Sequence, residues 1–216
     1  MSFLPGMSGA ICGGFTRGFP RVENQATTVG NSLTTSHSTD LPSGIVAGEI
    51  LMIVIAAGSA ATASGWSALI SNDITVLWKV ATGSEGATVT VTTSGSTVYA
   101  AVAYRISNGQ SVEAGSASGT STNPDPPSLS PTWGAAKTLW FAAAESIPTS
   151  PGGTNQISAF PSGYTNTQNI IGSDGTFSQR LGTCENQIEA ATENPGTFTL
   201  NSSRPWMAVT IAVRPQ

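Results

Sequence analysis

Residues 81–90 read ATGSEGATVT, and residues 191–200 read ATENPGTFTL. Each stretch precedes an Ala-Val run, which is AVAYR at residues 101–105 and AVTIAVR at residues 208–214. A pattern that returns within one chain is typical of an internal duplication. We therefore expect the chain to contain two copies of one structural unit.

The similarity extends outward from these stretches. Pro42-Ser43-Gly44, which leads into residues 51–53, matches Pro127-Ser128-Leu129, which leads into residues 139–141. Gly65-Trp66 likewise matches Gly163-Tyr164. Between these points, short Val/Ile/Thr/Ala runs alternate with clusters of Gly, Pro, Ser and Asn, a pattern that indicates strands joined by turns. No stretch has the period of a long amphipathic helix.

The pattern predicts an all-β chain. The expected strands lie near residues 27–37, 50–57, 74–80, 87–92 and 97–106 in the first copy, and near 139–144, 166–171, 177–190, 196–201 and 206–213 in the second. Two roughly four-stranded units, each with one apolar face, can bury those faces against one another. We predict a jelly-roll-like antiparallel β-sandwich of about eight strands, with half-units at about 20–110 and 125–215 and a linker over 111–127.

The N-terminal segment differs from the rest of the chain. Residues 1–18 are rich in glycine and carry apolar side chains without a helical or strand period. These side chains, together with the first one of the body, are Phe3, Leu4, Ile11, Phe15 and Phe19. We predict an extended arm over residues 1–18 that docks on a partner, followed by a sandwich domain over 19–216. The alternative is a loose terminus, since chain ends are often unordered.

Composition excludes several classes of partner. Charged residues make up 9% of the chain, hydrophobic residues 39%, and the net charge is −4. Scattered Lys and Arg residues do not form a phosphate-binding surface, so we expect no nucleic-acid partner. The longest apolar run, residues 50–57, is too short to cross a bilayer, and no basic residue before Arg17 begins a secretory signal. A surface of hydroxyls rather than charges suits packing against other proteins, so we expect a homo-oligomer.

No catalytic pattern is evident. The lone histidine, His37, lies in a Ser/Thr-rich strand whose neighbouring side chains point to opposite faces, so a Ser/His/Asp triad does not fit there. The carboxylates are dispersed without calcium or zinc spacing, and Glu85 sits in a repeated turn where a role in the fold is favoured. We predict a non-enzymatic protein without a cofactor or metal. Cys12 and Cys184 are expected to be free thiols, with a disulfide as the alternative.

The aromatic residues leave one binding hypothesis open. Trp66, Trp78, Trp140 and Trp206 lie at or next to strand positions and are assigned to the core. Trp133 and Tyr164 lie in Pro/Gly-rich loops, where exposed rings could contact a ligand such as a glycan.

Several motifs resemble a structural domain of tailed bacteriophages. In the first half these are Phe19-Pro20, residues 41–51, Gly65-Trp66, residues 79–85 and residues 103–105. In the second half they are residues 124–129, Trp133-Gly134, Leu139-Trp140, and residues 161–164, 193–199 and 212–215. The resemblance covers about residues 19–215, and it carries over no catalytic residue.

The resemblance implies a β-sandwich component of the virion, assembled in the host cytoplasm. Its partners would be other virion proteins, either the major capsid protein or a tail component. We favour a capsid decoration or cement protein, with a trimer expected by analogy with decoration proteins. The alternative is a tail-associated fibre, adaptor or receptor-binding adhesin that holds glycans.

Overall fold

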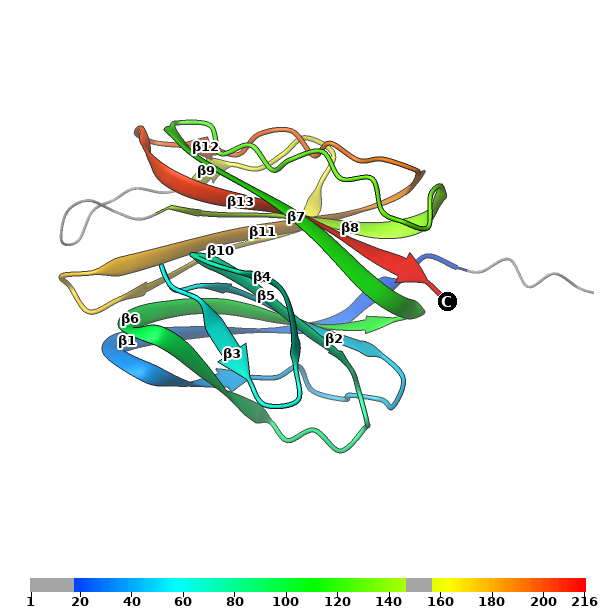
Figure 1. The fold of residues 1–216 in the computed structure, drawn as a ribbon, viewed down its shortest axis with the longest axis horizontal. Helices are drawn as coiled ribbons and strands as arrows, with labels where there is room; N and C mark the ends of the chain where they lie inside the picture. The colour runs from blue at the N-terminus through cyan, green and yellow to red at the C-terminus, as the bar shows by residue number, and fades with distance from the viewer. Residues whose placement is uncertain (1–17, 147–156) are drawn as a thin grey trace, which may run out of the picture.

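The computed structural model describes residues 18–146 and 157–216, and these residues form strands, turns and loops without a helix. The strands are β1 (Arg21–Asp40), β2 (Ile50–Ala56), β3 (Ala61–Ala63), β4 (Ser67–Ser71), β5 (Ile74–Val80), β6 (Thr88–Ser107), β7 (Gly109–Ser121), β8 (Ala136–Ser146), β9 (Ile157–Ala159), β10 (Thr165–Ser173), β11 (Ser178–Ala190), β12 (Thr199–Leu200) and β13 (Arg204–Pro215). Two antiparallel sheets pack face to face, which confirms the predicted sandwich (Figure 1). No helix that could span a membrane occurs in the described part of the chain.

The two sheets have the same topology. The first sheet has the order β1-β6-β2-β5-β4, with β3 paired to β6, and the second has the order β7-β13-β8-β11-β10. In the first sheet β6 lies between β1 and β2, and in the second sheet β13 lies between β7 and β8. In each half, the last strand therefore pairs with the first and the second strands of that half. β3 and β9 also correspond, because β3 pairs with β6 and β9 pairs with β12, just before β13. The predicted duplication is therefore present in the strand order.

The contacts between the two sheets indicate that the halves are related by an approximate two-fold rotation. β1 of the first sheet contacts β10 of the second, and β4 contacts β7. β1 is equivalent to β7 and β4 to β10, so each of these contacts becomes the other when the two halves are exchanged. A two-fold relation requires this. Structurally equivalent positions in the two halves can therefore be compared directly.

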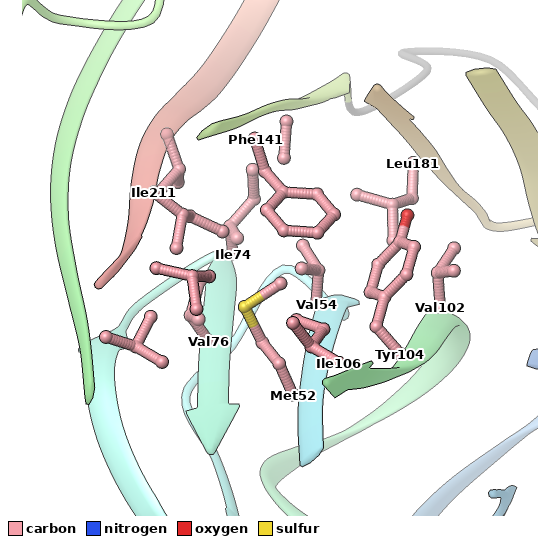
Figure 2. Packing of buried hydrophobic residues seen from close by; sticks show 14 of the residues in the cluster. Met52, Val54, Ile74, Val76, Val102, Tyr104, Ile106, Phe141, Leu181 and Ile211 are labelled. Carbon is pink, nitrogen blue, oxygen red and sulfur yellow. The ribbon is translucent and has the colours of Figure 1, made fainter. Parts of the chain in front are cut away.

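The core lies between the sheets and is shown in Figure 2. Tyr104 from β6 and Phe141 from β8 lie with ring centroids 4.9 Å apart at 55°, a tilted arrangement that aromatic pairs favour. The Tyr104 hydroxyl is hydrogen-bonded to the Thr183 hydroxyl on β11, so its polar atom is satisfied inside the sandwich. Two further apolar clusters lie on the outer faces of the sheets, under loops and the short strands. Every side chain of β2 is buried for this reason.

The strand register corrects one predicted equivalence. Ile50 pairs with Ile106 in the first half, and Leu139 pairs with Val213 in the second. If Ala-Val 101–102 corresponds to Ala-Val 208–209, then Ile106 corresponds to Val213, and their partners Ile50 and Leu139 are equivalent. Residues 51–53 therefore match 140–142, one residue away from the predicted match with 139–141. Side chains alternate between faces, so a shift of one would move Trp140 into the inter-sheet core. Trp140 instead packs in the outer cluster of the second sheet.

The predicted linker over residues 111–127 is wrong for most of its length. Residues 109–121 form β7, which pairs with β13 along the edge of the second sheet. The chain crosses between the sheets at Asn108, whose φ is 56°. An edge strand is held mainly by backbone hydrogen bonds, so β7 needs few large apolar side chains, and its Gly/Ser/Thr composition resembles that of a linker.

Candidate functional site

Most residues predicted for the docking arm lie outside the described residues. These are Phe3, Leu4, Ile11 and Phe15, and Cys12 lies there too. Phe19, the last of the set, is described and is half-buried. Pro20 follows it, and its carbonyl oxygen accepts a hydrogen bond of 2.8 Å from Gln187 Nε2 on β11. The arm therefore joins a well-anchored point of the sandwich.

The two predicted ligand-contact rings are engaged in packing. Tyr164 is 9% exposed, belongs to the outer cluster of the second sheet, and donates its hydroxyl to Glu193 Oε1 at 3.1 Å. Burial raises the pKa of Tyr164. Trp133 is half-buried against the same cluster, and its Nε1 donates to Thr138 Oγ1 at 3.2 Å. The two rings thus cover the sheet, and this placement does not favour a glycan-stacking platform.

His37 is a buried component of a folded-back ribbon. Its ring stacks on Tyr99 with centroids 4.4 Å apart, and its Nε2 lies 3.2 Å from Thr93 Oγ1. Burial lowers the pKa of His37. β1 and β6 are long paired strands that bend together, so that one part of the pair lies over the outer face of the first sheet (Figure 1). The Tyr99 and Thr39 hydroxyls are hydrogen-bonded there at 2.7 Å. His37 serves packing in this arrangement.

Glu85 has the role in the fold that its repeated turn position predicts. Its carboxylate accepts hydrogen bonds from the backbone nitrogens of Thr82 and Gly83, at 2.7 and 3.0 Å, and pairs with Lys79 Nζ at 2.9 Å. Partial burial opposes ionisation, but these contacts outweigh it and lower the pKa of Glu85 to about 2. The carboxylate therefore holds the turn before β6.

Cys184 is a free thiol buried in the outer cluster of the second sheet. Burial raises the pKa of this thiol to about 12. A thiol that stays protonated and covered is a poor nucleophile.

A polar pocket with a volume of about 440 Å³ lies where the start of β1 meets β10 and β11. Its lining residues are Arg21, Val22, Thr165, Glu185, Asn186 and Gln187. The volume lies within the range of ligand-binding clefts, about 300–1,000 Å³. Sequence reasoning did not single out any of these residues, because they come from segments far apart in the chain.

Glu185 is the most unusual residue in this pocket. One of its carboxylate oxygens, Oε2, is buried and has no hydrogen-bond partner. Burial raises the pKa of Glu185, and a hydrogen bond from Asn166 only partly opposes it. Within the described residues, neither Glu185 nor the exposed Arg21 forms an ion pair. The pocket therefore contains a desolvated carboxylate with which no described residue forms an ion pair.

Comparison of the two halves shows that Glu185 is specific to the second. Glu185 pairs with Phe141, and the equivalent position in the first half, opposite Met52, is Trp78. The Trp78 side chain packs against the inter-sheet core. Where the first half places an indole ring, the second half places a carboxylate, and a pocket of about 420 Å³ lined by Val80, Gly109 and Gln110 lies at the corresponding end of the first half. Aligning β5 with β11 would have revealed the difference, but their sequences are too dissimilar for the repeat to be detected there.

The backbone around the pocket is irregular. The pairing of β10 with β11 shifts register between Thr165 and Gln168, and Asn166 between them has a φ of 49°. The side chain of Asn166 donates a hydrogen bond of 2.9 Å from Nδ2 to Gln25 Oε1 on β1. Bulges and left-handed residues outside glycine occur often near binding sites, where they redirect side chains. This bulge turns β10 at the wall of the pocket.

Both described termini lie at one end of the sandwich (Figure 1), and exposed apolar side chains occur at both ends. At the terminal end, defined by Gly18, Asn108 and Gln216, the backbone nitrogen of Gln216 donates to the Asn108 carbonyl at 3.0 Å. Val80, which is 49% exposed, lines a pocket at this end with Gly109 and Gln216. At the distal end, defined by Val29, Leu33 and Phe177, these side chains are 45%, 48% and 57% exposed. A hydrogen bond of 2.9 Å from the Ser173 nitrogen to Asn31 Oδ1 ties β1 to the β10–β11 turn that carries Phe177.

No family model, curated protein or solved structure matches this chain. In residues 18–146 and 157–216, no group of three or more His, Cys, Asp or Glu side chains is placed to hold a metal ion.

Proposed function

We propose that this chain is a non-enzymatic structural protein of a bacteriophage particle, namely a capsid decoration or cement protein. The resemblance to structural domains of tailed phages supports the kind of particle. The observation that carries the proposal is that both described termini lie together at one end of the sandwich, where residues 1–17 with their apolar side chains join it.

This arrangement suits a module that attaches on one side and presents a surface on the other. Residues 1–17 precede the terminal end and could extend over at most about 60 Å at 3.3–3.6 Å per residue. The apolar residues Phe3, Leu4, Ile11 and Phe15 in this segment give it surface to bury on a neighbour. In the proposed function the arm holds the sandwich on the head shell, and the distal end faces outward.

The location can be tested by gold-tagged electron microscopy together with the number of copies per purified particle. Label spread over the heads, with hundreds of copies, would support decoration of the shell. Label confined to tail tips, with a handful of copies, would favour the alternative, a tail-associated fibre, adaptor or receptor-binding adhesin. Absence of label from purified particles would refute both forms of the proposal.

The role of the arm needs a separate experiment. A chain that lacks residues 1–18 is expected to keep its sandwich fold, as measured by circular dichroism, and to lose binding to particles that lack the protein. A matched control is the full chain with Leu33→Ser and Phe177→Ser, which changes only the distal end and should still bind. Undiminished binding by the truncated chain would rule out docking through the arm.

The oligomeric state follows from the same proposal. A decoration protein at a three-fold position of a shell would form a trimer, which is the state we propose for this chain. Sedimentation equilibrium of the full chain, with and without residues 1–18, measures this directly.

A further inference from the structure

We propose that the pocket between β1 and β11 binds a cationic side chain, lysine or arginine, that a neighbouring protein presents to Glu185. That the occupant belongs to a protein rests on the proposed function. The chemistry of the pocket can be tested without it.

The argument begins with the carboxylate. Oε2 of Glu185 is buried without a hydrogen-bond partner, and a desolvated acceptor of this kind costs free energy until a donor reaches it. In the described chain the two ion pairs of carboxylates involve Glu85 and Glu49, so none serves Glu185. An ammonium or guanidinium group would supply both the missing donor and the missing charge.

The other lining residues disfavour the main alternatives. The lining contains no aromatic ring, so a sugar ring would find no stacking surface there. An anion would meet Arg21, but the Arg21 side chain is exposed and already solvated, whereas the anion would lie close to the desolvated Glu185. The remaining polar side chains are Thr165, Asn186 and Gln187, which offer neutral hydrogen bonds. The group that lacks a partner is negative, and the ligand that completes it is positive.

The position of the pocket suits a partner that the chain has already engaged. Arg21 and Val22 line it, and Pro20 is held by Gln187, another lining residue. Residues 1–17 end immediately before this point. A protein held by the arm would thus face the mouth of the pocket, and a basic side chain on that protein would add a fixed point of attachment to a long and otherwise apolar contact.

A cationic ligand would also explain why the second half has Glu185 where the first half has Trp78. If the site served only packing, an apolar ring such as Trp78 at the equivalent position would stabilise it through burial, as in the first half. Glu185 at this position instead buries a carboxylate oxygen without a partner, and burial raises the pKa of the carboxyl group, which opposes stability. A cationic ligand would offset this cost by supplying the missing donor and charge, which gives Glu185 a function at this position.

The test is a chemical-shift titration of the full chain with Nα-acetyl-lysine methylamide. We expect binding in the millimolar range, with shifts centred on Arg21, Thr165 and residues 185–187. The Nε-acetylated analogue has no charge and should bind at least about tenfold more weakly, because a charge-assisted hydrogen bond is lost. Equal binding of the two analogues, or shifts elsewhere on the surface, would overturn the proposal.

Variants of the chain provide the second arm. Glu185→Gln should weaken binding about tenfold or more, whereas the exposed Glu189→Gln on the same strand should leave it unchanged. Arg21→Gln should tighten binding, because it removes a like charge from the mouth of the pocket. Weaker binding by Arg21→Gln, or binding of methyl glucoside in place of the lysine derivative, would show that the pocket selects another ligand. Particle location plays no part in these measurements, so their failure leaves the proposed function standing, and the reverse also holds.

Discussion

Glu145 provides the sharpest physical test of this structure. It lies at the end of β8, is fully buried, and neither of its carboxylate oxygens has a hydrogen-bond partner. Its strand neighbours are Leu181 on β11 and Met207 on β13. Burial, followed by the nearby carboxylate of Asp73, raises the pKa of Glu145 from 4.5 to about 8. The folded protein therefore binds this proton far more tightly than the unfolded chain does.

The sign of the effect on stability follows from linkage. Between pH 4.5 and 8 the folded state keeps the proton that the unfolded state has lost, so the free energy of unfolding falls as pH rises. The contribution of Glu145 is complete below pH 4.5 and is lost above pH 8. At 1.36 kcal/mol per unit, the loss is about 3 kcal/mol by pH 7 and about 5 kcal/mol above pH 8.

The perturbation is Glu145→Gln, which keeps the shape and removes the titration. We expect the stability of the variant relative to the natural chain to rise by several kcal/mol from pH 5 to pH 8, measured by urea unfolding at intervals of half a pH unit. Subtracting the two curves removes the effect of His37, whose lowered pKa acts in the opposite direction. Glu189→Gln, on an exposed position, is the matched control. Parallel curves for Glu145→Gln and the natural chain would refute the reasoning.

Two further substitutions test the packing of the sheets. A Cβ at Gly172 would lie 2.1 Å from the Tyr99 carbonyl oxygen, so Gly172→Ala should destabilise the fold by about 3 kcal/mol or more, whereas Gly95→Ala has open space and should cost less than about 1 kcal/mol. Equal midpoints of thermal unfolding for these two variants would show that the sheets do not approach as closely as described. Tyr104→Phe leaves the buried Thr183 hydroxyl without its partner and should cost about 1–3 kcal/mol, and adding Thr183→Val should recover part of that loss. A double-mutant cycle with no coupling would contradict the hydrogen bond.

Strands with strong apolar patterns were the most predictable elements. The strand expected over residues 74–80 matches β5, and the run beginning at Ile50 matches β2 within one residue. The strands that were missed are short or polar, such as β4 at Ser67–Ser71 and β7 at Gly109–Ser121. These strands lie at sheet edges, where backbone hydrogen bonds to one neighbour suffice and side chains carry little pattern.

The candidate site was far less predictable. Tyr164 and Trp133 were singled out because they lie in loops, yet both rings pack against the outer cluster of the second sheet. Glu185 drew attention only as one of several dispersed carboxylates. What distinguishes it is one buried carboxylate oxygen, Oε2, that has no hydrogen-bond partner in a residue that lines a pocket, together with the indole of Trp78 at the equivalent position.

The amino-acid sequence by itself determined that the chain is all-β and duplicated, because strand-forming runs, turn residues and repeats are local patterns that survive without any knowledge of contacts. Only the tertiary structure decided the register of the repeat, the burial of Glu145 at the place where the first half has Ala56, and the placement of Arg21 and Glu185 around one pocket. The physical reason is that a shift of one residue reverses the face of every side chain in a strand, and that desolvation of a carboxylate depends on all the segments packed around it.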